Sequence, residues 1–147
     1  MLNKATRTVN AKLAYELITS TLLTTRLVSA LKLIWKCNIP LKLIYFNWLC
    51  MENRINTWDN LIRKGWAGPN RCCLCRIGEE YVNHLFSACS FTHNIINCLS
   101  RILQLEMDWN APSLENLELW FSKENEFLHL PLLISWNLWL TRNRIVF

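Results

Sequence analysis

The sequence has little of what a β-rich fold needs, and it lacks the long apolar runs of membrane proteins. Three glycines and four prolines in 147 residues are few for a fold with many tight turns. The best candidate for a membrane span, 127–140, contains His129, Ser135 and Asn137 and is shorter than the ~20 residues required. Charged residues make up only 18% of the chain against 52% hydrophobic, which excludes disorder. We expect one compact domain over 1–147, without membrane contact, that buries roughly two-thirds of its unfolded surface.

The chain also lacks the marks of a secreted protein. Its start, Met1-Leu2-Asn3-Lys4, does not have the pattern of a signal peptide. The number of cysteines is odd, which does not fit a set of disulfides. The seven are Cys37, Cys50, Cys72, Cys73, Cys75, Cys89 and Cys98. An intracellular, reducing compartment is therefore predicted, and both the nucleus and the cytoplasm fit.

Apolar residues recur with helical spacing along most of the chain, which predicts an all-α fold. Pro40 can open a helix whose apolar stripe comprises Leu41, Ile44, Tyr45, Trp48 and Leu49, widened by Leu43 and Phe46. Helical runs are expected over 9–20 and 21–36, either joined as one helix or separated by a break near 20–25, and further helices over 57–65, 79–88, 90–103, 113–123 and 131–147. The helix after Ser90 should bury Ile95, Cys98, Leu99, Ile102 and Leu103. The prediction is six to seven short helices around one core.

A cysteine and histidine cluster over residues 72–89 is the most specific motif. Cys72, Cys75, His84 and Cys89 follow the spacing C-x2-C-x8-H-x4-C. Thiolate sulfur and imidazole nitrogen are ligands that Zn²⁺ prefers, and four of them complete a tetrahedron. No open position is left for water or substrate, so the spacing predicts a structural zinc knuckle. Gly78 lies in the connection, where its lack of a side chain tolerates a positive φ.

Two other residues compete for places in this motif. Cys73 can replace Cys72, and His93 can replace His84 from a helix face four residues after Cys89. The x2 spacing favours Cys72. A C-x2-C pair alone is also typical of a redox site, but a redox pair does not need a histidine and a third cysteine at ligand spacing.

Charge is divided unevenly along the chain. Residues 1–78 carry twelve Lys and Arg against Glu16, Glu52 and Asp59, a net charge of +9, whereas residues 79–147 carry a net charge of −4. A basic half that ends at a zinc site indicates a polyanion partner, RNA or DNA, unless the charge forms an ordinary solvated helix face. The candidate phosphate contacts are Lys32, Lys36, Lys42, Arg63, Lys64, Arg71 and Arg76. The adjacent Glu79 and Glu80 are expected at a solvated helix start, because neighbours on a helix do not share a face.

Taken in order, these residues resemble a known family. The sequence is similar to the zinc-binding domain that follows the polymerase in reverse transcriptases of plant non-LTR (LINE-type) retrotransposons. The most specific matches are Cys72, Cys75, Glu80, His84-Leu85-Phe86 and Cys89. Flanking matches are Val9, Ala14-Tyr15, Ile34-Trp35, Ile39-Pro40, Lys42, Phe46, Trp48, Thr57, Leu61, Arg63-Lys64-Gly65, Trp136, Trp139, Arg142-Asn143 and Phe147. Asn56 and Tyr81 depart from the family pattern without touching a ligand position.

The resemblance implies an accessory role beside a polymerase, in which the domain holds template RNA or target DNA. The sequence contains no Asp-Asp polymerase motif, no carboxylate cluster for RNase H chemistry and no nucleophile paired with a base. We therefore expect no catalysis, and at most a part of a reverse transcriptase. The alternatives are a scaffold module that docks on a polymerase domain, or a retrotransposon-derived fragment without present function.

Overall fold

The structure is a computed structural model that describes residues 32–35, 37–111, 113–122 and 127–147. Its elements are α3 (Leu41–Met51), α4 (Trp58–Arg63), η1 (His84–Ala88), α5 (Ser90–Leu103), α6 (Ser113–Ser122) and α7 (Leu130–Val146). Across these ranges there is no β-strand, so the prediction of an all-helical fold with a Cys3His cluster is confirmed. The helices expected over 9–20 and most of 21–36 lie outside the described residues, as does Lys36.

Local sequence signals place several helix ends. Pro40 occupies the N-cap position of α3, and α7 carries Pro131 in its first turn. The N–H groups of a first turn have no partner within the helix, so a proline there costs no hydrogen bond. α4 ends just before Gly65, whose φ of 88° suits a residue without a side chain. No helix in the described part of the chain is both long and apolar enough to cross a membrane.

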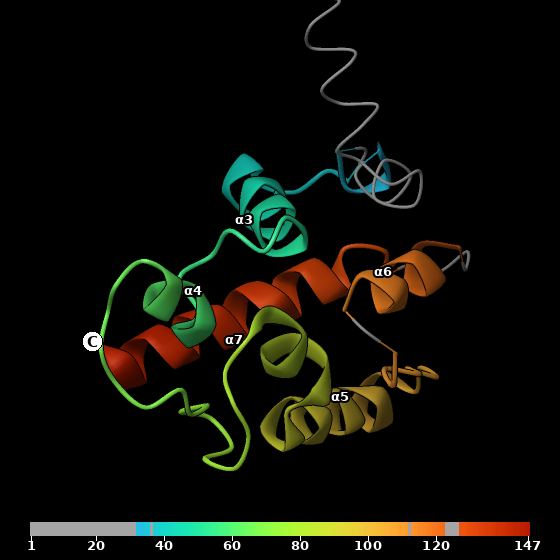
Figure 1. The fold of residues 1–147 in the computed structure, drawn as a ribbon. Coiled ribbons are helices and arrows are strands. Elements are labelled where there is room, and N and C mark those ends of the chain that lie inside the picture. The colour runs from blue at the N-terminus through green and yellow to red at the C-terminus, as the bar shows by residue number, and fades with distance from the viewer. Residues whose placement is uncertain (1–31, 36, 112, 123–126) are drawn as a thin grey trace, which may run out of the picture.

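Helix α7 runs through the middle of the molecule (Figure 1). α3 packs on it from one side, while η1 contacts it from the other and also packs on α5. α4 lies near the carboxyl end of α7, and α6 lies near its amino end (Figure 1). The carboxyl-terminal helix thus joins the amino-terminal α3 to the segment that carries the predicted zinc ligands.

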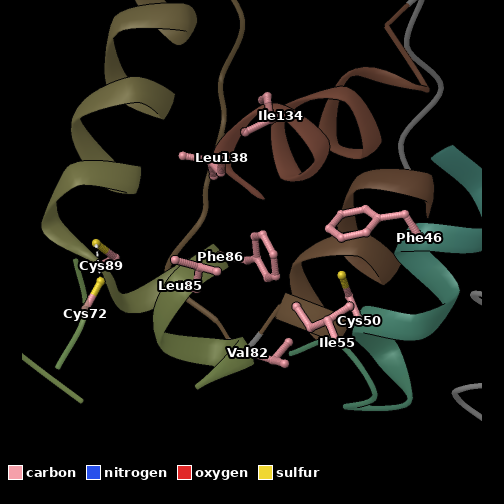
Figure 2. Packing of buried hydrophobic residues seen from close by; sticks show 10 residues of the cluster. All are labelled: Phe46, Cys50, Ile55, Cys72, Val82, Leu85, Phe86, Cys89, Ile134 and Leu138. Carbon is pink, nitrogen blue, oxygen red and sulfur yellow. Dashed lines mark hydrogen bonds between the residues drawn. The ribbon is translucent and has the colours of Figure 1, made fainter. Parts of the chain in front are cut away.

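The buried side chains form two clusters. In the first, the ring of Phe46 on α3 meets the ring of Phe86 on η1 nearly edge-on, at a centroid distance of 6.2 Å (Figure 2). The ring of Phe46 meets that of Trp136 on α7 in the same way, at 5.1 Å. Such edge-to-face contacts are favourable because the positive ring edge meets a negative face. The second cluster includes Ile34 and Leu132, both fully buried. Each cluster combines residues from distant parts of the chain.

The predicted buried face of α3 is wrong in part. Leu41 and Tyr45 are 64% and 52% exposed, whereas the buried positions are Leu43, Ile44, Phe46, Asn47 and Cys50. This helix is apolar around most of its circumference, so periodicity alone fits more than one face. The buried amide of Asn47 decides the orientation, because its Nδ2 donates to the carbonyl of Leu132 at 3.2 Å.

The predicted face of α5 is also wrong in part. Ile102 is 70% exposed, Cys98 is exposed and Ile95 is 37% exposed, while Thr92 and Ile96 are the buried positions. The hydroxyl of Thr92 is hydrogen-bonded in the interior, because it donates to the carbonyl of Leu85 at 2.7 Å. Leu99 and Leu103 are half-buried, so only part of the predicted apolar stripe is at the surface.

Candidate metal centre

Three local structures position the four predicted ligands. Cys72 and Cys75 lie on a turn closed by two backbone hydrogen bonds, from the N–H of Arg76 to the carbonyl of Cys72 and from the N–H of Cys72 to that of Gly78. His84 begins η1, a π-helical turn. Cys89 follows this turn at the N-cap position of α5. The backbone N–H of Cys89 donates to the carbonyl of His84 at 2.8 Å, which folds the last two ligands back toward the first two.

The donor atoms of Cys72, Cys75, His84 and Cys89 all lie within 4.8 Å of one another. The Sγ atoms of Cys72 and Cys89 are 3.9 Å apart, and Sγ of Cys75 is 3.2 Å from Nε2 of His84. A tetrahedral zinc site with Zn–S bonds of about 2.3 Å has S···S edges of about 3.8 Å. The three sulfurs and one imidazole nitrogen therefore fit Zn²⁺ in kind, number and spacing.

Gly78 shapes the site by its lack of a side chain. A Cβ at this position would lie 2.7 Å from Cε1 of His84, closer than any real contact allows. The imidazole of His84 therefore packs directly against the backbone of Gly78. Gly78 does not adopt the positive φ that its position tolerates, and the left-handed residue of the turn is Arg76, with φ of 59°.

The two buried cysteines share a proton. The hydrogen bond between their sulfurs raises the pKa of Cys72, with burial adding to the rise, and it lowers the pKa of Cys89 to about 4. Either sulfur can be the donor of this hydrogen bond, so one proton is held between the two thiols. A divalent cation at this point displaces the shared proton, because it binds thiolates and not thiols.

Comparison with known proteins now bears on this centre. A family model described as zinc-binding in reverse transcriptase matches residues 10–95, more than half of the chain and all four cysteine and histidine positions. The chain belongs to this family. No curated protein and no solved structure matches the chain at a significant level. The match covers the zinc-binding part of reverse transcriptases and not their polymerase part.

Within this reverse-transcriptase zinc-binding domain, the two competing ligands lie elsewhere. Sγ of Cys73 is directed to the carbonyl of Arg142 at 3.8 Å, and Cys73 is not part of the four-residue cluster. His93 is not part of the four-residue cluster. The geometry favours Cys72 and His84, and their role as ligands stays a prediction that metal analysis can test.

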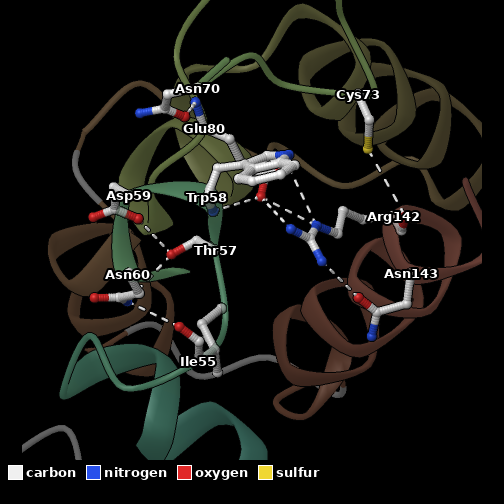
Figure 3. A network of polar contacts seen from close by, with 10 residues as sticks. All are labelled: Ile55, Thr57, Trp58, Asp59, Asn60, Asn70, Cys73, Glu80, Arg142 and Asn143. Carbon is white, nitrogen blue, oxygen red and sulfur yellow. Dashed lines mark hydrogen bonds and ion pairs between the residues drawn. The ribbon is translucent and has the colours of Figure 1, made fainter. Parts of the chain in front are cut away.

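A buried ion pair next to the knuckle was not predicted from the sequence. Glu80 and Arg142 are both 0% exposed, and Nη2 of Arg142 donates to Oε1 of Glu80 at 2.6 Å (Figure 3). Nε of Arg142 donates to the same carboxylate at 3.1 and 3.2 Å. The expectation that Glu80 lies in a solvated helix start is therefore wrong. Both residues are among those that carry the family resemblance, but they lie 62 positions apart and no local pattern pairs them.

Further contacts make this ion pair a junction of three segments (Figure 3). The carboxylate of Glu80 accepts a hydrogen bond from the backbone N–H of Trp58 at the start of α4, at 3.0 Å. Its own N–H donates to Oδ1 of Asn70 at 2.9 Å. The guanidinium of Arg142 also lies over the ring of Trp139, 5.0 Å from its centroid, a favourable cation–π contact. The zinc segment, α4 and α7 are thereby held to one another.

The predicted phosphate contacts are distributed unevenly. Lys32 is exposed and lies in the segment 32–35, whose Ile34 belongs to the second buried cluster together with Leu117 and Trp120 of α6. Nζ of Lys42 is 5.7 Å from the ring centroid of Trp136 on α7. The other four described candidates, Arg63, Lys64, Arg71 and Arg76, are all exposed and lie along the stretch from the end of α4 to the knuckle turn. We refer to these four as the basic stretch.

Members of the basic stretch differ in their partners. Arg63 forms an ion pair with Asp59, at 3.0 Å, and Nζ of Lys64 donates to Oδ1 of Asn56 at 2.6 Å. Among the described residues, the guanidinium group of neither Arg71 nor Arg76 has a hydrogen-bond or ion-pair partner. These two guanidinium groups, immediately before and after the Cys72–Cys75 turn, are thus available to an external anion.

Proposed function

We propose that the chain is a zinc-stabilised, non-catalytic accessory domain of a reverse transcriptase that binds nucleic acid through the basic stretch. In this proposal, Cys72, Cys75, His84 and Cys89 hold one Zn²⁺, whose role is to fix the turn between Arg71 and Arg76. Membership of the zinc-binding family and the close approach of the four donor atoms support the metal site. A filled coordination sphere supports a structural and not a catalytic ion.

One observation carries the nucleic-acid part. Between Asp59 and Glu79 there is no acidic residue, and this stretch contains four exposed basic side chains, two of them without a partner among the described residues. Phosphate groups attract such side chains irrespective of base sequence. We therefore propose RNA or DNA as the partner, without sequence specificity. An origin in a plant non-LTR element, a reducing compartment and a single domain that extends to Phe147 belong to the same proposal.

The test is a binding measurement by fluorescence anisotropy across a salt series, with single-stranded oligonucleotides and zinc-loaded protein. Each phosphate contact contributes about 0.7 to the slope of log affinity against log salt for single strands. Replacing all four basic residues with Gln should reduce this slope by roughly two to three. Zinc content should not change. An unaltered slope in the quadruple variant would refute the proposed contacts.

A matched pair of double variants sharpens this test. Arg71→Gln with Arg76→Gln removes two charges from the basic stretch, and should reduce the slope by about 1.4. Arg101→Gln with Arg144→Gln removes two exposed charges from α5 and α7. This control should leave the slope unchanged, so that an effect of total charge is separated from an effect of position.

A second candidate function is docking on a polymerase domain, and the exposed stripe of α5 supports it. Phe91, Ile95 and Leu99 line an apolar groove of about 340 Å³, and Leu133 and Thr141 of α7 lie on its other side. Apolar burial depends little on salt, whereas phosphate contacts weaken steeply. If the partner of the chain is a polymerase domain alone, its affinity should be nearly constant across the salt series.

A further inference from the structure

Trp66, in the segment that carries the basic stretch, is one of two exposed tryptophans among the eight. Six of the eight are buried or half-buried, whereas Trp66 is 58% and Trp35 is 53% exposed. Indole rings usually contribute to stability by burial. Trp66 lies between Lys64 and Arg71, in a run of residues that is exposed from Ile62 to Pro69.

The backbone around Trp66 is fixed by specific contacts. Its N–H donates to the carbonyl of Leu61 at 3.1 Å, which ties the residue to the end of α4. Two residues later, the backbone of Gly68 lies flat against the indole of Trp58, so close that a Cβ there would be 3.1 Å from the ring. Asn70 then accepts a hydrogen bond from the backbone N–H of Glu80 (Figure 3). Trp66 is thus presented to solvent by a loop attached at both ends.

The surroundings of Trp66 select a ligand that combines negative charge with flat aromatic groups. The nearest acidic residues along the chain are Asp59 and Glu79, so every charged residue between them, on either side of Trp66, is basic. Arg71 is five residues away, at most ~18 Å along an extended chain, which is within the length of a few nucleotides. A protein partner would also use an exposed indole, but charge of one sign along the whole stretch favours a polyanion.

We propose that Trp66 is a stacking platform for an unpaired base, and that the nucleic acid bound at the basic stretch is single-stranded. This inference rests on the proposed function and adds the strand state and the residue that selects it. A base in a duplex has both faces covered by its neighbours, whereas a base in a single strand can place one face on the indole while its phosphates meet Arg71 and Arg76. Stacking tolerates any base, which agrees with binding without sequence specificity.

The test compares Trp66→Ala with Trp35→Ala, two substitutions of comparably exposed tryptophans. Binding is measured on zinc-loaded full-length chain with three probes: a 12-nucleotide single strand, the same strand with abasic sites, and the corresponding duplex. Trp66→Ala should weaken binding of the intact strand roughly 5- to 150-fold. The salt slope should stay the same, because no phosphate contact is lost. Trp66→Phe should restore most of the affinity, and Trp35→Ala should bind as the unsubstituted chain does.

The abasic strand isolates stacking from charge, because it keeps every phosphate. Trp66→Ala and the unsubstituted chain should bind it equally, and they should also bind the duplex equally. If Trp66→Ala binds the intact strand normally while the quadruple Gln variant loses its salt slope, the stacking inference is overturned and the proposed function stands. If the unsubstituted chain binds none of the three probes, both are overturned.

Discussion

Replacing Glu80 or Arg142 by leucine tests the buried junction most directly. Each single substitution leaves the other charge buried and unpaired, since both side chains are fully enclosed and the ion pair is made through Nε and Nη2. Removing one member of such a pair typically costs about 3–5 kcal/mol. Whole domains are stable by roughly 5–15 kcal/mol, so either variant should lose a large part of the free energy of unfolding.

The double variant, with leucine at both Glu80 and Arg142, should lose less free energy of unfolding than the sum of the two single variants. With both charges gone, the main remaining penalty is the backbone N–H of Trp58, which loses its acceptor on Glu80. An unsatisfied buried donor costs about 1–3 kcal/mol. The double variant should therefore lose at least about 3 kcal/mol less than the sum of the singles, a strong coupling for two residues in contact.

The assay is urea unfolding followed by circular dichroism in excess zinc, so that metal loss does not enter the comparison. At a slope of about 2 kcal/mol per molar urea, each single variant should lower the midpoint by about 1.5–2.5 M. Arg63→Leu is the matched control, because it breaks an exposed ion pair with Asp59 on α4 and should cost only about 0.3–0.5 kcal/mol. Single effects that add within about 0.5 kcal/mol would refute the reasoning.

Two further predictions concern the metal centre. Elemental analysis should give one zinc per chain, lost in Cys75→Ser and His84→Ala but retained in Cys73→Ser. Structural zinc contributes about 10–16 kcal/mol to the folding of small peptides, so the chain should not fold without it. A folded chain without metal would contradict this prediction. Gly78→Ala should weaken zinc binding about tenfold or more, as the loss of groups that orient a metal ligand does, because the new Cβ displaces the imidazole of His84. Competition with a colorimetric chelator measures this change, and an unchanged affinity would show that the ring does not need the glycine.

The sequence by itself was sufficient for the grouping of the four metal-ligand residues. Cys72, Cys75, His84 and Cys89 lie within 18 residues, so a turn and a short helix are enough to bring their donor atoms together. Helix boundaries at Pro40 and Gly65 were equally accessible, because the restricted or unusual φ of one residue determines them. These features depend on chemistry within a few positions of the chain.

Only the tertiary structure decided which helix faces are buried and that Glu80 and Arg142 form a buried ion pair. Helical spacing of apolar residues predicts that the stripe of α5 with Ile95 and Ile102 is buried, yet Thr92 and Ile96 are the buried positions. Periodicity shows that a helix has an apolar face but not what covers that face. Similarly, Glu80 and Arg142 are ordinary charged residues in the sequence, and they become a buried pair because α7 passes beside the zinc segment. Partners 62 residues apart are chosen by packing, which local sequence does not encode.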